Sequence, residues 1–232
     1  MQQWVIPPGQ SAAFVADMER VLDVYAEPYD LRRPVVCLDE RPCALVGEGR
    51  APLPMRPGSD QKQDHEYVRG GLCCAFLAFE PLQAWRRAWV RPQRRRLEFA
   101  EVVRELCDEA YPEAEVVRIV CDNLNTHTPA AFYERYPAAE ARRLAERVEF
   151  VYTPVHGSWL VGCTPAHVVE CEFSVMVRQC IAHRRLGEIA VLRREIAAWV
   201  AARNAEGATV EWQFTTADAR VKLRRLYPSV IT

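Results

Sequence analysis

Apolar residues along the chain recur with two different periods, and each period predicts a kind of element. Continuous apolar runs bounded by turn residues predict buried strands at residues 35–40, 67–79, 83–90, 116–122 and 148–152. Apolar positions at helical spacing predict helices at residues 12–25, 97–110, 130–136, 138–147, 167–183 and 188–205. The first strands follow one another directly, and strands and helices alternate after them.

This order favours an α/β fold with a mixed sheet flanked by helices. The turn at Glu80 and Pro81 joins two strands and is too short for a crossover helix, so these strands must be antiparallel. An all-parallel dinucleotide-binding sheet is therefore disfavoured. The chain also lacks a Gly-x-Gly-x-x-Gly string and a Walker A string, which removes the main nucleotide-binding alternatives.

A length of 232 residues, half of them hydrophobic and 26% charged, is typical of one globular domain. We divide the chain into a linker with a leading helix at 1–30 and a main domain at 31–232. Residues 47–63 are rich in Gly, Pro and charge, and we expect them to be disordered. Neither a membrane-spanning run nor a signal peptide is visible, so we expect a cytoplasmic protein without a membrane partner.

Cysteine usage and charge restrict the chemistry further. The nine cysteines are an odd number and form no Cys-x-x-Cys pair, so we expect reduced residues in the core. The formal net charge of −1 supplies no general attraction for nucleic acid. A nucleic-acid substrate would therefore require a local basic patch or a separate domain.

Two acidic residues come at the ends of predicted strands. Asp39 closes the run at 35–40, and Asp122 closes the run at 116–122. Carboxylates at one edge of a sheet repel each other, and a cation between them removes that repulsion. Oxygen ligands without Cys or His favour Mg²⁺ or Mn²⁺ over Zn²⁺. Each Asp also fits a turn or helix cap, so the pattern alone does not decide between these interpretations.

Six strings in order resemble the Asp-Asp-Glu transposases of bacterial insertion sequences, specifically the insertion-sequence 630 group of the mariner-like superfamily. They are Val36-Cys-Leu-Asp-Glu-Arg-Pro42, Asp64-His-Glu-Tyr-Val-Arg-Gly70, Val120-Cys-Asp-Asn-Leu-Asn-Thr-His127, Tyr152-Thr-Pro-Val-His-Gly-Ser-Trp-Leu160, Glu170-Cys-Glu-Phe-Ser174 and Trp212-Gln-Phe-Thr-Thr-Ala-Asp-Ala-Arg220. The resemblance extends from Trp4 to Pro228.

The resemblance implies a ribonuclease H-like catalytic domain in which Asp39, Asp122 and Glu170 hold two Mg²⁺ or Mn²⁺ ions. The implied reaction is metal-dependent cleavage of double-stranded DNA at transposon ends and joining of the freed 3′ hydroxyl to a TA target. The implied assembly is a homodimer. The family's helix-turn-helix region, which recognises the terminal inverted repeats, has no counterpart here, so the resemblance implies a truncated chain or a separate helix-turn-helix polypeptide.

Two residues compete for the position of the third acid. Glu170 and Glu172 lie about 200° apart on a helix, so only one can face the metals, and spacing does not choose. Residues 161–166 are also an insertion relative to the family. We expect it to form a loop, because Thr164 and Pro165 suit a helix start. Glu170 would then share a core-facing stripe with Phe173, Val177 and Ile181, and Glu172 would face away.

Further candidates near these acids each have a structural alternative. Asn123, Asn125 and His127 follow Asp122 and could orient water or phosphate, or cap the next helix. His156, Ser158 and Trp159 could contact DNA, or form a turn with a buried ring. The basic residues Arg94, Arg95 and Arg96 could contact phosphates, or form a solvated turn.

Two other functions stay open at this point. The chain could be an inactive transposase remnant that binds only DNA or partner subunits, or an unrelated ribonuclease H-like nuclease. A zinc site at Cys163, His167, Glu170 and Cys171 is disfavoured because the spacing matches no zinc module.

Overall fold

The computed structural model describes residues 9–154, 168–209 and 214–229 of the chain. Its centre is a five-stranded sheet in the order β3-β2-β1-β4-β5. The strands are β1 (Val35–Glu48), β2 (Tyr67–Glu80), β3 (Trp85–Arg91), β4 (Val117–Cys121) and β5 (Val148–Tyr152). β1, β2 and β3 pair antiparallel, whereas β1, β4 and β5 pair parallel. The predicted mixed sheet is confirmed.

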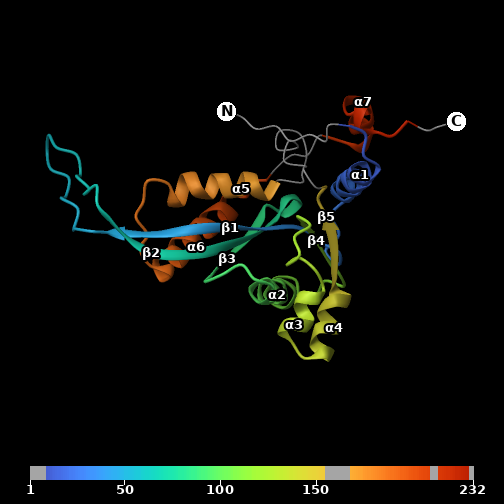
Figure 1. Ribbon diagram of the computed structural model, residues 1–232, viewed down its shortest axis with the longest axis horizontal. Helices are drawn as coiled ribbons and strands as arrows, with labels where there is room; N and C mark the ends of the chain where they lie inside the picture. The colour runs from blue at the N-terminus through green and yellow to red at the C-terminus, as the bar shows by residue number, and fades with distance from the viewer. Residues whose placement is uncertain (1–8, 155–167, 210–213, 230–232) are drawn as a thin grey trace.

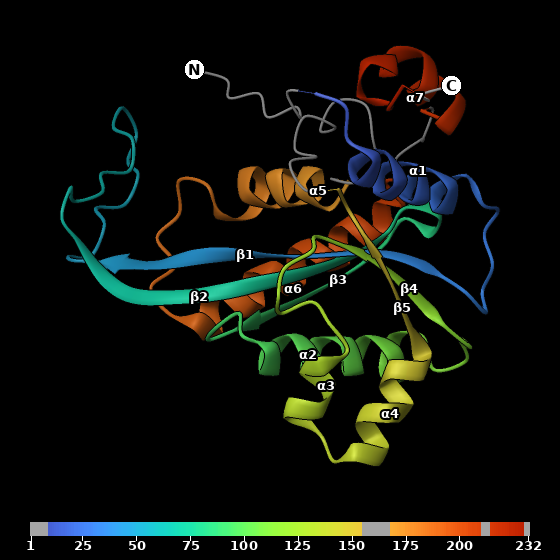
Figure 2. The ribbon, with the colours of Figure 1, turned by 45° about the vertical axis from the view of Figure 1, so that its right-hand side comes forward.

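Helices cover both faces of this sheet, as Figures 1 and 2 show. The helices in chain order are α1 (Ala12–Ala26), α2 (Arg96–Glu105), α3 (Ala130–Arg135), α4 (Ala138–Arg147), α5 (Val168–Met176), α6 (Ile189–Glu206) and α7 (Thr216–Lys222). α2 and α5 each continue into a π-helical turn, at Leu106–Ala110 and Val177–Ile181. Short 3-10 turns occupy Pro81–Gln83 and Arg224–Leu226.

Strand alternation divides the core between the two faces. The even positions of β1, Val36 and Leu38, pack with Phe99 of α2 and Phe132 of α3. The odd position Cys37 faces the opposite side, where α5 and α6 form a second cluster over β1, β2 and β3. A third cluster on that side joins α1 and α7 to β4 and β5. The α5 face and the α2 face of the sheet therefore bury different residues of the same strand.

β1 is longer than the sequence pattern predicts. It continues past Asp39 to Glu48, because β2 pairs with it from Cys37 to Glu48, while β4 pairs only with Val35–Cys37. Pro42 lies beyond the β4 pairing, so its missing N–H removes no bond to that strand. The predicted strand end at Asp39 is thus wrong, although the position of Asp39 beside β4 is retained.

The stretch 47–63, predicted to be disordered, instead belongs to the long β1–β2 hairpin that projects from the molecule in Figure 1. Backbone bonds join Leu53 to Lys62 and Arg56 to Ser59 near its tip. At its base, Arg185 binds the Glu48 carboxylate at 2.7 Å and the carbonyl oxygens of Asp64 and Glu66. The loop between α5 and α6 therefore ties the two hairpin strands together.

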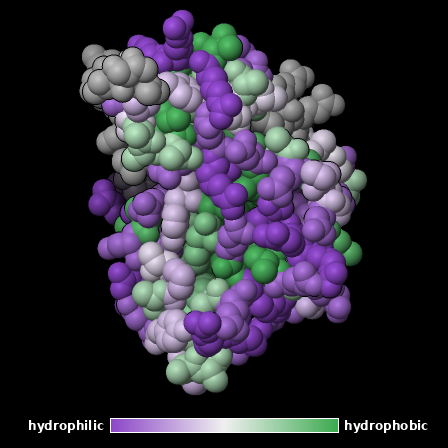
Figure 3. All heavy atoms as spheres, turned by 90° about the vertical axis from the view of Figure 1, so that its right-hand side faces the viewer, coloured by the Kyte–Doolittle hydropathy of each residue, from purple (hydrophilic) through white to green (hydrophobic). Residues whose placement is uncertain are grey.

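The remaining helix and strand predictions are close to the structure, and α4 and β5 have the predicted bounds. The helix α7 was not predicted. The eight described cysteines are free, and all except Cys171 are buried, as expected. None of the described helices has the length and apolarity needed to cross a membrane. On the face drawn in Figure 3, hydrophobic side chains are scattered among hydrophilic ones.

Candidate active site

Two neighbouring parallel strands bring Asp39 and Asp122 together. The β1–β4 register pairs Val35 with Arg118 and Cys37 with Val120. Continued by two residues, the same register places Asp39 alongside Asp122, directly after the end of β4. Asp39 has the parity of the face that α5 covers, because side chains alternate along a strand.

Glu170 approaches the same edge of the sheet from α5. A cavity of about 410 Å³ lies between this helix and β1, and its lining is formed by Asp39, Glu40, Arg41, Pro42, Glu170, Phe173 and Ser174. α5 packs on β1 and β2, with Val169 and Phe173 buried in their shared core. The first turn of the helix is thereby held where Glu170 borders the cavity beside Asp39.

The acids at this site influence one another electrostatically. Burial is the main cause that raises the pKa of Asp39 to about 7, and the negative charges of Glu40, Asp122 and Glu170 raise it further. The backbone N–H of Glu40 donates to Asp39 Oδ1 at 2.7 Å and partly offsets these effects. A carboxyl group whose pKa is raised in this way releases its proton more readily when a cation binds nearby.

The structure separates the roles of the two acids on α5. Glu172 is buried, and its carboxylate forms an ion pair with Arg86 of β3. Glu170 is partly exposed at the cavity. The predicted stripe is therefore wrong in part: Phe173 is buried, but Val177 and Ile181 are only partly buried, and Glu172 faces the interior rather than away. The charge of Glu172 is compensated by Arg86, which lies 86 residues earlier in the chain. The helical pattern of α5 does not reveal this partner.

His127 connects the two acidic strands from the α2 face. Its ring is 1% exposed, with Nε2 2.9 Å from Oε2 of Glu40 and Nδ1 2.7 Å from Oδ1 of Asp122. Nδ1 also lies 3.1 Å from the backbone carbonyl of Asp122. Burial lowers the pKa of His127, but its contacts with Asp122, Cys121 and Glu40 outweigh burial and raise that pKa to about 12. The ring is therefore charged, and it holds Asp122 in place relative to β1.

Several further contacts fix this histidine. Its ring stacks on Phe99 of α2 with 4.5 Å between ring centroids. The hydroxyl of Tyr152, at the end of β5, donates to the His127 carbonyl at 2.7 Å. The loop after Asp122 is thus anchored to β1, β5 and α2, so the position of the second acid depends on the whole sheet edge.

The donor set suits a hard cation, but the described residues do not form a finished cage. No group of three or more His, Cys, Asp or Glu side chains in the described ranges is already close enough to hold a metal ion. Oδ1 of Asp122 is buried and lies 2.7 Å from Nδ1 of His127. The raised pKa of Asp39 fits a carboxylate that a divalent cation would stabilise.

The other predicted residues divide into two groups. Asn123 and Asn125 are exposed in the loop after Asp122. Arg96 binds the carbonyl of Asn125 at 3.0 Å and pairs with Glu134, while Arg95 pairs with Glu98. Among the described residues, no hydrogen bond or ion pair involves the exposed side chain of Arg94. The basic loop therefore borders the loop of the second acid, and Arg94 is its most available charge.

Some predicted residues lie outside the described ranges. They are His156, Ser158, Trp159, the insertion 161–166 and the candidate zinc ligands Cys163 and His167. Their predicted roles, and the loop predicted for the insertion, stay predictions.

Sequence reasoning missed three residues at or near the site. Glu40 and Arg41 directly follow Asp39, and both line the cavity. The clue to Glu40 was the strand pattern, because an acid next to Asp39 must face the opposite side of the sheet and needs a partner there. Arg86 had no such clue, since it lies within a run of mixed polarity on β3.

Comparisons with known proteins agree with this geometry. The sequence profile of DDE superfamily endonucleases matches residues 34–193, well over half of the chain. The Mos1 mariner paired end complex with Mn has a TM-score of 0.52 and 18% identity, covering 89% of this chain and 61% of the Mos1 chain. The Mos1 strand transfer complex has a TM-score of 0.52 and 17% identity, with 89% and 62% covered. No curated protein sequence matches this chain.

This chain spans about three fifths of the length of those Mos1 chains. At such low identity the likeness establishes the fold alone, a ribonuclease H-like mixed sheet flanked by helices. The profile match includes β1, β4 and α5, with Asp39 in β1, Asp122 directly after β4 and Glu170 in α5. The chain belongs to the DDE superfamily of endonucleases.

Proposed function

We propose that this chain is the catalytic domain of a cut-and-paste DNA transposase of the insertion-sequence 630 group. It cleaves DNA strands at transposon ends and joins the freed 3′ hydroxyl to a TA target. The observation that supports the proposal is that Asp39 borders one cavity with Glu170 and lies two residues past the β1–β4 pairing that leads to Asp122, inside the segment that matches the DDE endonucleases.

Asp39, Asp122 and Glu170 are the residues that would hold two Mg²⁺ or Mn²⁺ ions. Bound there, the ions would activate the attacking water or hydroxyl and stabilise the leaving oxygen of the phosphodiester. The Mos1 structure with Mn supports a divalent cation in a protein of this fold. The raised pKa of Asp39 and the negative charges of Asp122 and Glu170 near it support it in this chain.

Side chains near these acids can hold them in place and bind a negatively charged substrate. His127 keeps Asp122 beside β1 through its contacts with Glu40 and Asp122. Arg41 is exposed on the lining of the cavity, where its guanidinium can contact a phosphate next to the acids. Arg94 can contact the backbone of the same duplex from the neighbouring loop.

The proposed assembly follows the same likeness. The Mos1 structures are a paired end complex and a strand transfer complex. We propose a homodimer acting on two transposon ends in the bacterial cytoplasm, with inverted-repeat recognition by a helix-turn-helix module.

The test is strand cleavage by the purified chain on three substrates with Mg²⁺ or Mn²⁺. The substrates are a duplex with the repeats that flank the gene, a random duplex and an RNA–DNA hybrid. We expect metal-dependent nicking of DNA, lost in Asp39→Asn, Asp122→Asn and Glu170→Gln. Glu134→Gln, a surface acid paired with Arg96, is the matched control and keeps its activity.

Each contrary result has a distinct meaning. Preference for the RNA–DNA hybrid would identify an unrelated nuclease of the same fold. DNA binding without cleavage under any metal condition would identify an inactive remnant. Cleavage that persists in all three acid variants would place the active centre elsewhere.

A further inference from the structure

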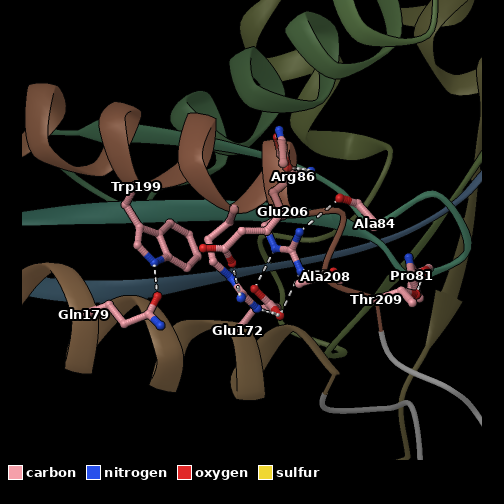
Figure 4. Close-up of polar contacts among 11 residues, drawn as sticks. Pro81, Ala84, Arg86, Glu172, Gln179, Trp199, Glu206, Ala208 and Thr209 are labelled. Atoms are coloured by element: carbon pink, nitrogen blue, oxygen red, sulfur yellow. Dashed lines mark hydrogen bonds and ion pairs between the residues drawn. The ribbon is translucent and has the colours of Figure 1, made fainter.

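A buried ion pair lies two residues beyond the third acid. Arg86 of β3 donates from Nε to Oε2 of Glu172 at 2.6 Å and from Nη2 to Oε1 at 3.1 Å. The two side chains are 0% and 5% exposed. Figure 4 shows the guanidinium facing the Glu172 carboxylate across the space between β3 and α5. This two-pronged geometry fixes direction as well as distance.

The same guanidinium binds two further segments. Nη1 donates to the carbonyl of Ala84 at 2.9 Å, and Nη2 donates to that of Ala208, just after α6. The Asn204 side chain accepts from the Arg86 backbone N–H and donates to its carbonyl, both at 2.8 Å. Arg86 is thereby fixed from the start of β3 and the end of α6, and it offers α5 a rigid partner.

Apolar packing alone would leave the rotation of α5 poorly determined. Between residues 169 and 176, its buried apolar residues are Val169, Phe173 and Met176. Contacts of this kind are not directional, so a modest turn of the helix about its axis would still bury much of the same area. A carboxylate held by a fixed guanidinium does not allow that turn without breaking its two hydrogen bonds to Arg86 and the 3.5 Å contact from Nη2 of Arg203 on α6.

The rotation of α5 decides where Glu170 points. Residues 170 and 172 lie about 200° apart around the helix. When Glu172 is held between β3 and the end of α6, Glu170 is left on the side of the cavity that Asp39 borders. A turn of the helix that released Glu172 would swing Glu170 away from the other two acids.

A buried ion pair is seldom needed for stability, because apolar residues of similar volume often replace one without loss. Its attested use is to select one arrangement among several. We propose that Arg86 is a positioning residue for the third acid: through Glu172 it sets the rotation of α5 and so directs Glu170 at the metal site. The inference rests on the proposed function, because it assigns a purpose to the orientation of Glu170.

The test compares Arg86→Lys, Glu172→Gln and the double replacement Arg86→Met with Glu172→Leu. The control is Arg87→Lys, which alters an exposed ion pair with Glu109 one residue along the same strand. Mn²⁺ binding is followed by electron paramagnetic resonance, and DNA nicking is measured against Mn²⁺ concentration. Thermal unfolding reports whether each variant is folded.

We expect the double variant to fold like the wild type but to bind Mn²⁺ at least about tenfold more weakly, as changes behind metal ligands commonly do. The Mn²⁺ concentration that the double variant needs for nicking should rise by the same factor. Its KM for DNA should not change. The single variants Arg86→Lys and Glu172→Gln should also bind Mn²⁺ more weakly and require more Mn²⁺ for nicking. Arg87→Lys should change neither quantity.

A folded double variant with wild-type Mn²⁺ affinity and nicking would overturn the proposal. So would a double variant that fails to fold, because the pair would then support the fold rather than one acid. A wild-type chain that neither binds Mn²⁺ nor nicks DNA would instead reject the proposed function, with no variant involved.

Discussion

At the scale of single residues, Asp39 should make the proposed metal site sensitive to pH. Its pKa is raised from 3.8 to about 7, chiefly by burial. A raised carboxyl pKa means that the folded state prefers the protonated form. The stability that Asp39 contributes is therefore fully present below about pH 3.8 and is lost as the pH rises through about 7.

We predict opposite pH trends for stability and for metal binding. Without metal, the free energy of unfolding should fall between about pH 4 and 7, by no more than about 4 kcal/mol. Mn²⁺ affinity should rise over pH 6 to 8, because the ligand must be ionised. Urea unfolding and calorimetric titration measure the two quantities. Asp39→Asn should flatten the stability profile, and an unchanged profile would exclude Asp39 as its source.

His127 and Glu40 give a second prediction at this scale. His127→Gln leaves Glu40 buried without its charged partner, and breaking such a pair typically costs about 3 kcal/mol or more. It also frees Asp122, so Mn²⁺ affinity should fall about tenfold. Thermal unfolding and Mn²⁺ titration measure both effects. His65→Gln, at an exposed histidine, is the control. Unaltered Mn²⁺ affinity in a folded His127→Gln would show that the histidine does not hold the acid.

The sequence points to the candidate acids more directly than to the residues that contact them. Asp39 and Asp122 follow apolar runs that are visible locally. The partners Glu40 and His127 are 87 residues apart, and Arg86 and Glu172 are 86 apart. No local period encodes such pairs, so the burial of Glu172 contradicted the amphipathic pattern of its own helix.

At the scale of elements, the predictions were accurate wherever an element's own pattern determines its limits. α4 begins after Pro137, and β5 follows it directly, so the sequence pattern was enough to predict the bounds of both elements. β1 was predicted too short because its second half is stabilised by β2 alone, a tertiary pairing that overrides Pro42 and the polar residues around it. α7 was missed because it is a short helix whose one buried residue, Ala219, gives little periodicity.

The base of the β1–β2 hairpin offers a prediction at this scale. A Cβ added at Gly70 would lie 2.3 Å from the carbonyl oxygen of Gly187, so backbone must move to admit it. We expect Gly70→Ala to destabilise the protein by about 1 to 3 kcal/mol. It should also speed amide hydrogen exchange at the hairpin base around Glu48 and Glu66. Gly9→Ala meets no atom within 4 Å and is the control. Equal stability of the two variants would contradict the close approach.

At the scale of the whole molecule, charge is balanced rather than polarised. The formal net charge is −1, and many arginines are matched by nearby carboxylates, as in the pairs Arg96–Glu134 and Arg142–Glu146. An arginine that already has an acidic partner gains less from a phosphate, since it must give up that partner. DNA affinity should therefore depend on the few exposed arginines near the site that have no acidic partner among the described residues, such as Arg94.

This leads to a prediction about salt dependence. Each phosphate neutralised by a basic residue changes the slope of log K against log salt by about 0.9 for duplex DNA. Arg94→Ala should therefore reduce the magnitude of that slope by about one, similarly for repeat-containing and random duplexes, since a phosphate contact carries no sequence information. Fluorescence anisotropy at several salt concentrations measures the slope.

Arg96→Ala should change the slope less, because Arg96 is bound to Glu134 and to the Asn125 carbonyl. Arg142→Ala, on α4 and paired with Glu146, should not change it. Equal effects of Arg94→Ala and Arg142→Ala would mean that DNA does not run past the loop before α2. The duplex would then have to run past Arg41 instead. The same measurement on Arg41→Ala would show whether it does.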